Sequence, residues 1–567
     1  MTTQDKISAL MAKMSVQDKV GQCFVIGFTG SVMTPAILER IANIRPAGVR
    51  MGMNFRIKSA YYDPYAVGEK FAHRALRSPT GTVKDFLPGL PPPYLTCAEY
   101  ADFLNRLKRA ALANPAGIPL HITYDMEGDI SADFPRSPMR FFPSSKGLAQ
   151  TGDPQLADDV AWAVGSQMGA LGCSWIHWPV LDVNTDPLNP EIGMRSFGDN
   201  ADTVIEYGMK VFEGLKRAGT IATAKHFPGR GHSIGDAHHG LPTVELDREG
   251  LEEHIRPFRA LIDAGVPSIM TAHTTYPALD PSGDPASLSK RIITDFLKGE
   301  LGFAGAVTSD DITMGAILED YEVHEAVIKA INAGTDLILL RDESTLVDEV
   351  YAKVIEAVES GEITEERLND ATARVLKVKL EYGLFETGAL VETDLADKPA
   401  RSREVVTIAA DAAKRTTRVL RDEQSLLPLK PGTRVLLVEQ ANPLHINVNS
   451  QECHPGILWE AMLEHSPQVA MVEVKMSYED RDHARIANRM DEADVIVMTN
   501  TYYRRGASGH EFVRDFCRDC EKPVVVITNT DLPLSLDDSY KTVVLSYGSS
   551  PESVREVARH LYGKAGD

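Results

Sequence analysis

Short apolar segments alternate with helical patterns along the first two thirds of the chain, and this alternation constrains the fold most strongly. Apolar runs of strand length occur at 20–27, 47–54, 120–125, 174–183, 221–224, 267–272, 304–309 and 336–340. The first helical patterns are an amphipathic helix over 4–19 and a helix that Thr34 caps and that runs through Ile44. Strands that alternate with helices form parallel sheets with crossover helices. Eight or so such units over about 390 residues predict a TIM-type (β/α)8 barrel or an incomplete variant of one.

A second unit follows the predicted barrel. A long helical pair over 345–386 closes the barrel domain, which we assign to residues 1–386, and the charged segment 387–401 is predicted to be a linker. A helix over 402–418 then leads to apolar strands at 434–440, 468–476, 493–500, 522–530 and 541–548, and an amphipathic helix over 551–563 ends the chain. This pattern predicts a smaller α/β sandwich domain over residues 402–567.

Charge and composition exclude several classes of partner. The formal net charge is −21, which argues against binding to nucleic acid or to an anionic membrane surface. The N-terminus lacks the basic start and apolar core of a signal peptide, and no apolar run is long enough to span a membrane. The six cysteines are sparse and are expected to be ordinary reduced thiols. These features predict a cytoplasmic protein.

Residues 56–97 interrupt the alternation, because they are rich in tyrosine, proline and charge and show no clean period. An insertion of this length after a strand often forms an active-site wall or a subunit contact, as in a homodimer. A segment that only runs over the surface, without a functional role, is an equally good interpretation.

Titratable side chains gather in the stretch from Ile221 to Pro242, where an apolar strand gives way to a loop with four glycines. The stretch contains Lys225, His226, Arg230, His232, Asp236, His238 and His239. A flexible loop at a strand end is a common place for catalytic groups, although a solvated basic surface loop is the plainer interpretation. Other strand ends are followed by Asp125, by Arg195 in the segment 189–198, and by the adjacent pair Asp310 and Asp311.

The order Lys225-His226-Phe227-Pro228-Gly229, followed by Asp236-Ala237-His238, resembles a loop of the family-three glycoside hydrolases, in the subgroup of bacterial β-N-acetylglucosaminidases. The resemblance implies that His238 is the general acid/base and that Asp236 orients it. It also implies that Asp310, the first aspartate of its pair, is the nucleophile, and that Asp311 turns away toward a helix N-terminus. The chain departs from the family pattern at Arg230, where histidine is usual, and at His232, where aspartate is usual.

The same resemblance implies a set of sugar-binding residues. Asp125 would hold sugar hydroxyls and Arg195 would contact the sugar, and the rest of the set is Lys225, His226, Arg230 and Met314. Asp129 stands where the family pattern has a second glycine. For a single Asp or Arg at a strand end, a salt bridge at the barrel rim is the usual explanation, but here the residues follow the order of one family.

The implied activity is that of a retaining β-glycosidase, acting on N-acetylglucosamine-type or related β-hexosides through a covalent glycosyl-Asp310 intermediate. Its partner would be a small carbohydrate, and neither a metal nor an organic cofactor is required. One alternative is a phosphorylase that uses inorganic phosphate as acceptor, because a neutral imidazole base does not repel an anion as a carboxylate would. Arg230 is then expected to contact an anion, unless it pairs with a carboxylate such as Asp129. A catalytically silent sugar-binding barrel is the third possibility.

Overall fold

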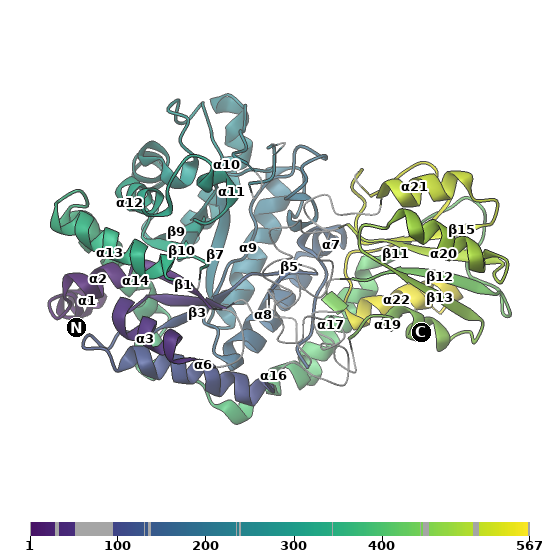
Figure 1. Cartoon of the computed structure of the whole chain (residues 1–567), viewed down its shortest axis with the longest axis horizontal. Coiled ribbons are helices and arrows are strands. Elements are labelled where there is room, and N and C mark those ends of the chain that lie inside the picture. Colours follow the sequence, from purple (N-terminus) through teal and green to yellow (C-terminus); the bar gives the residue numbers. More distant parts are fainter. Residues whose placement is uncertain are drawn as a thin grey trace.

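The computed structural model describes residues 2–28, 33–51, 95–129, 131–133, 138–233, 235–237, 240–342, 344–442, 444–445, 453–502, 510–533 and 535–564. His238 and His239 lie outside the described residues, as does the insertion 56–97 except for its last three positions. Figure 1 shows a barrel with surrounding helices and, beside it, a smaller unit built on one sheet.

The first unit is a closed barrel of eight parallel strands, as predicted. Its strands are β1 (Phe24–Phe28), β2 (Gly48–Met51), β3 (His121–Tyr124), β6 (Trp175–Ile176), β7 (Ile221–Phe227), β8 (Ser268–Thr271), β9 (Ala306–Asp311) and β10 (Leu337–Leu340). They follow the order β1-β10-β9-β8-β7-β6-β3-β2 around the barrel. Each of the eight predicted apolar segments overlaps one of these strands. Because all the strands are parallel, their carboxyl ends meet at one face, where barrel enzymes place their active sites.

Helices cover the outside of the barrel (Figure 1). The longer ones are α3 (Pro35–Ile44), α6 (Cys97–Leu112), α8 (Pro154–Leu171), α9 (Ala201–Arg217), α10 (Arg248–Asp263), η4 (Arg291–Glu300), α12 (Val323–Ala333), α13 (Leu346–Glu359) and α14 (Glu365–Glu381). The Thr34 hydroxyl accepts a hydrogen bond from the backbone N–H of Ile37 and so caps α3, as predicted.

The prediction of one helix over 4–19 was wrong. The segment forms two helices, α1 (Thr3–Met11) and α2 (Val16–Gly21). Ser15 begins the second helix, since its side chain accepts from the backbone N–H of Asp18 while the Asp18 carboxylate accepts from the backbone N–H of Ser15. This reciprocal capping box stabilises a new helix start inside the amphipathic pattern.

The second unit is a six-stranded sheet with helices on both faces. Its elements are α17 (Arg403–Thr416), β11 (Thr417–Asp422), β12 (Val435–Gln440), α19 (Ile457–Leu463), β13 (Val469–Val474), α20 (Asp480–Met490), β14 (Val495–Asn500), α21 (His510–Asp519), β15 (Val524–Thr528), β16 (Thr542–Ser546) and α22 (Pro551–Tyr562). The strand order is β11-β16-β15-β14-β12-β13, and the edge strand β11 is antiparallel to its neighbour β16. Strand β11 was not predicted. In the predicted linker the chain forms two short helices, η5 (Thr393–Leu395) and α16 (Lys398–Arg401).

Hydrogen bonds join the two units. The Tyr502 hydroxyl donates to the carbonyl of Pro190 at 2.6 Å, and the Asn529 side-chain amide donates to the Asp129 carboxylate at 3.2 Å. The second unit therefore contacts the face of the barrel on which the strands end. Among the described residues, no helix is both long enough and apolar enough to cross a bilayer.

Candidate active site

Asp310 and Asp311 end strand β9, and their side chains have different surroundings. The Asp310 carboxylate accepts the backbone N–H of Asp311 at 2.8 Å, and its side chain retains 16% of its exposure. The Asp311 carboxylate instead accepts the backbone N–H and the hydroxyl of Thr313, at 3.1 and 2.8 Å, and the backbone N–H of Arg341 at 3.3 Å. Asp311 thus holds the loop, whereas the Asp310 carboxylate accepts only the N–H of its neighbour among the described residues.

Asp310 carries a negative charge at neutral pH. Burial by itself raises the pKa of this carboxyl. The nearby His273 and the Arg230 guanidinium lower it by more than burial raises it, and the resulting pKa is about 2. The His273 Nε2 donates to the backbone carbonyl of Asp311 at 3.0 Å, and its Nδ1 lies 2.7 Å from the Ser287 hydroxyl. His273 therefore supports the end of β9.

A network of buried cations and carboxylates lies behind the partly exposed Asp125. Lys225 Nζ lies 2.6 Å from Asp125 Oδ1 and 2.5 Å from Glu127 Oε1. Arg195 binds Glu127 through two N–H groups at 2.7 and 2.9 Å, and Arg50 lies 2.5 Å from the other oxygen of Asp125. The Asp125 side chain is 26% exposed, while the Lys225, Arg195 and Arg50 side chains are at most 4% exposed. The cations thus hold Asp125 in place without covering it.

These cations also fix the charge of the two carboxylates. Burial raises the pKa of Glu127, but Arg195 and Lys225 outweigh this effect and hold that pKa at about 2. Burial also raises the pKa of Asp125, but Arg50 and Lys225 outweigh burial and hold this pKa well below its usual value. Both side chains are therefore hydrogen-bond acceptors at neutral pH, and Asp125 has room to accept sugar hydroxyls.

His226 is held at both ring nitrogens. Its Nδ1 lies 2.7 Å from Asp182 Oδ2, and its Nε2 lies 3.3 Å from an Arg195 N–H and 3.9 Å from Asp310 Oδ2. Because a guanidinium only donates, Nε2 is the acceptor and Nδ1 carries the proton. Burial, reinforced by Arg230 and Arg195, lowers the pKa of His226 well below its usual value. This neutral imidazole positions its neighbours.

Arg230 is buried and pairs with Glu191. Its Nη2 lies 2.5 Å from Glu191 Oε1, and its backbone N–H donates to Asp182 at 2.7 Å. The side chain is 2% exposed. The pairing with a carboxylate agrees with one of the two interpretations of this residue, but the partner is Glu191; Asp129 instead accepts from the backbone N–H of Ser549 at 2.8 Å. The other unusual residue of the loop, His232, lies 2.9 Å from the Thr185 hydroxyl through its Nδ1.

The loop with the predicted dyad is attached to the segment that follows Asp310. The backbone N–H of Ala237 donates to Glu191 at 3.3 Å, and its carbonyl accepts from the backbone N–H of Ala316 at 3.0 Å. Ala237 also packs in a small apolar cluster with Met314 and Ala316. Met314, predicted to bind substrate, is buried there, and Asp236 is half-buried. His238 comes directly after Ala237 and lies outside the described residues.

Several residues of this network were not among the predicted site residues, namely Arg50, Glu127, Asp182, Glu191 and His273. Glu127 and Glu191 lie close in the sequence to predicted site residues, two residues after Asp125 and four residues before Arg195. The stronger signal is a charged residue at or just after an apolar strand, since such charges are buried only when they are paired. Among the described residues, no group of three or more His, Cys, Asp or Glu side chains is arranged to hold a metal ion.

A barrel face with a partly exposed, ionised aspartate and a second partly exposed carboxylate held by buried cations has the features of a glycosidase site. Comparison with known proteins agrees. Residues 94–378, half of the chain, match the family described as the glycosyl hydrolase family 3 N-terminal domain. The chain therefore belongs to glycoside hydrolase family 3.

Within that family the chain is similar to β-hexosaminidases. It is 31% identical over 360 residues to β-hexosaminidase A of Pseudoalteromonas piscicida, a match that covers 60% of this chain and 59% of that protein. The solved structure of a family 3 β-N-acetylglucosaminidase from Paenibacillus sp. FPU-7 is 27% identical with a TM-score of 0.82, and the match covers 98% of this chain and 97% of the other. A β-glucoside phosphorylase shares the fold, with 21% identity, a TM-score of 0.77 and coverage of 100% and 95%.

Proposed function

We propose that the protein is a retaining β-glycosidase that acts on β-linked N-acetylglucosamine or a related β-hexoside. Asp310 would attack the anomeric carbon and form a glycosyl ester as the leaving oxygen departs. His238, oriented by Asp236, would donate its proton to that oxygen and then, as a neutral base, take a proton from the attacking water. Asp125 would accept hydrogen bonds from sugar hydroxyls.

The attachment of Ala237 supports this proposal most directly. Ala237 separates Asp236 from His238, and it is bonded and packed to Ala316 and Met314, which follow Asp310 by six and four residues. This contact brings Ala237, the residue between Asp236 and His238 in the sequence, next to the segment that follows the predicted nucleophile. His226, whose Nε2 lies 3.9 Å from Asp310 Oδ2, is a poor candidate for the acid because both of its ring nitrogens are engaged.

Varying the leaving group tests the role of His238. His238→Ala should reduce turnover of a β-N-acetylglucosaminide with a poor leaving group by at least about 100-fold, the usual contribution of acid catalysis. An activated aryl glycoside needs little proton donation and should lose much less. His239→Ala is the matched control for damage to the loop. Equal losses with all leaving groups would show that His238 is not the acid.

Phosphate as the acceptor is the second candidate, and the environment of Arg230 makes it less favoured than water. That guanidinium was the reason to expect an anion, yet it is buried and bonded to Glu191. Incubating aryl β-N-acetylglucosaminide and aryl β-glucoside with and without inorganic phosphate distinguishes the two reactions. A free sugar as the sole product supports hydrolysis, whereas a sugar 1-phosphate would establish phosphorolysis.

A further inference from the structure

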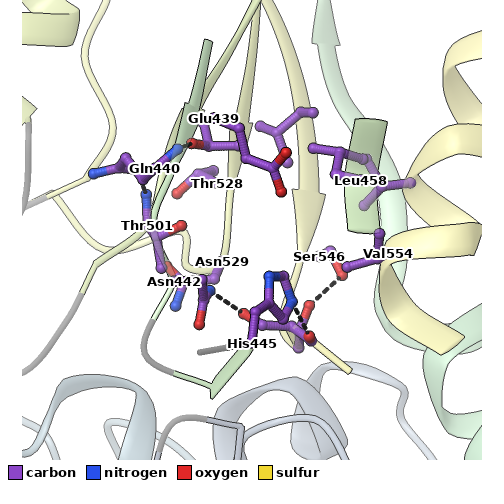
Figure 2. Close-up of a pocket in the computed structure, with 15 residues that line it drawn as sticks. Glu439, Gln440, Asn442, His445, Leu458, Thr501, Thr528, Asn529, Ser546 and Val554 are labelled. Atoms are coloured by element: carbon purple, nitrogen blue, oxygen red, sulfur yellow. Dashed lines mark hydrogen bonds between the residues drawn. The ribbon is translucent and has the colours of Figure 1, made fainter. Parts of the chain in front are cut away.

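A pocket in the second unit lies apart from the site described above. It comprises about 450 Å³ of space, part of it open to solvent. Residues of β12, β14, β15, β16 and α22 contribute to its wall, together with the segments that follow β12, β14 and β16. Figure 2 shows Glu439 and His445 at opposite ends of this pocket, with Leu458 and Val554 along one side.

The pocket lies where the connections of the sheet change direction. After β12 the chain passes to α19, which packs with α22 on one face of the sheet, and after β14 it passes to α21 on the opposite face. Strands β12 and β14 are neighbours, so their outgoing segments separate and leave a crevice at the carboxyl ends of the two strands. Open α/β sheets bind their ligands in such crevices.

Two buried side chains in this crevice have unused hydrogen-bonding atoms. Glu439, at the end of β12, is 4% exposed, and its Oε2 has no hydrogen-bond partner among the described residues. His445 is also 4% exposed and lies 2.7 Å from the Ser549 carbonyl through its Nε2. A carbonyl only accepts, so Nε2 carries the proton, and Nδ1 is a free acceptor within the described part of the chain. Buried polar groups without partners are rare in native structures.

Two neighbouring polar side chains, Gln440 and Thr499, are already hydrogen-bonded within the protein. The Gln440 side chain accepts from the backbone N–H of Thr501 and donates to the carbonyl of Met476, both at 2.6 Å. The Thr499 hydroxyl accepts from the backbone N–H of Gln440 at 2.7 Å. Among the described residues that line the pocket, the buried polar atoms without a partner are thus Glu439 Oε2 and His445 Nδ1, and both accept hydrogen bonds from a ligand once Glu439 is ionised.

The remaining wall narrows the class of ligand. No lysine or arginine is among the described residues that line the pocket, so none of these residues compensates an anion. Leu458, Ile527, Val554 and Val557 supply an apolar side, against which the C–H face of a sugar ring can pack. The pKa of the Glu439 carboxyl is raised to about 8, because burial and the nearby Glu473 raise it more than the backbone N–H groups of Leu458 and Trp459 lower it. A bound cation would remove the cost of ionising this group.

We propose that this crevice is a binding site for a hydroxylated primary amine of monosaccharide size, such as an amino sugar. The ammonium group would donate to Glu439 Oε2, and a hydroxyl would donate to His445 Nδ1. The site is separate from the barrel and does not depend on the reaction that the barrel catalyses.

Isothermal titration calorimetry of the intact protein with glucosamine, glucose and gluconate tests the site. Glucosamine should bind at least tenfold more tightly than glucose, and gluconate should not bind. Glu439→Gln keeps the shape of the side chain but removes its charge, and it should weaken glucosamine binding at least tenfold. The matched control is Glu473→Gln, which removes a carboxylate paired in register on the neighbouring strand but outside the pocket. Because Glu473 raises the pKa of Glu439, this variant should bind glucosamine at least as tightly as the wild type.

Either of two results would overturn the proposal: no binding of glucosamine to the wild type, or equal binding by the wild type and Glu439→Gln. Because glucosamine can also enter the barrel, the comparison between the two glutamate variants identifies the second-unit site. If Glu439→Gln does not fold, Val554→Phe fills the pocket from α22 and should abolish the same binding. Glucosamine binding that Val554→Phe leaves intact would refute the site. Because the readout is binding, failure here says nothing about catalysis in the barrel.

Discussion

Replacing Asp310 and Asp311 in turn by alanine should separate catalysis from stability. The Asp311 carboxylate accepts three hydrogen bonds, from the N–H and hydroxyl of Thr313 and from the N–H of Arg341. Hydrogen bonds to a charged group contribute about 1.5–3 kcal/mol each, and shared bonds are not additive, so Asp311→Ala should cost about 2–4 kcal/mol. Asp310 accepts only its neighbour's N–H among the described residues, so Asp310→Ala should change stability by about 1 kcal/mol or less.

The effects on turnover should be reversed. Without its nucleophile the Asp310→Ala enzyme should lose activity on an aryl β-N-acetylglucosaminide by on the order of 10⁴-fold or more. Asp311→Ala should lose at most about 100-fold, the scale of a small misplacement of the reacting groups. Urea unfolding and steady-state kinetics on both variants measure the two quantities. A stable but inactive Asp311→Ala enzyme, or an active Asp310→Ala enzyme, would refute the assignment of the nucleophile.

Three further predictions concern buried groups. Glu127→Gln leaves two buried cations undercompensated and should lower the free energy of unfolding by about 3–5 kcal/mol in urea denaturation; wild-type stability would contradict the network. Gly231→Ala would place a Cβ against the carbonyl oxygen of Val183, so the melting temperature of this variant should fall. A Cβ at Gly235 has more space around it, so the melting temperature of Gly235→Ala should fall less. The Glu439 pKa, raised from 4.5 to about 8, means that the folded state binds more protons between these pH values, so this group lowers stability as pH rises from 4.5 to 8. Glu439→Gln should remove up to roughly 4–5 kcal/mol of that dependence, which unfolding at pH 5 and pH 8 would measure.

The barrel could be predicted because its strands are buried on both faces and therefore read as continuous apolar runs. Strand β11 could not, because its sequence, Thr417 to Asp422, has no such run: Val419 and Leu420 are both exposed at the edge of the sheet, and charged residues surround them. The break between α1 and α2 had a local signal, Ser15 and Asp18 at capping-box spacing, which the amphipathic pattern obscured.

The chemistry of the site was only partly predictable. The resemblance to a family supplied Asp310 and Asp125, but the ion pairs around them join residues far apart in the chain. Arg50 meets Asp125 across neighbouring strands, and Arg230 meets Glu191 between two loops. No local pattern encodes such a pair, because the barrel brings its members together only when it closes. The partner of Arg230 could be predicted as a carboxylate, but not as Glu191.

Asp129 shows how a departure from the family pattern acquires a structural role. It stands where the family pattern has glycine, and its φ of 44° is in the left-handed region that glycine adopts most easily. A residue with a Cβ pays about 1–2 kcal/mol for that conformation. The Asp129 carboxylate accepts the backbone N–H of Ser549 and the amide of Asn529, and such bonds offset a cost of this size. Both partners belong to the second unit and both line its pocket. The residue that departs from the pattern thus links the pocket of the second unit to the segment that contains Glu127, two residues earlier in the chain.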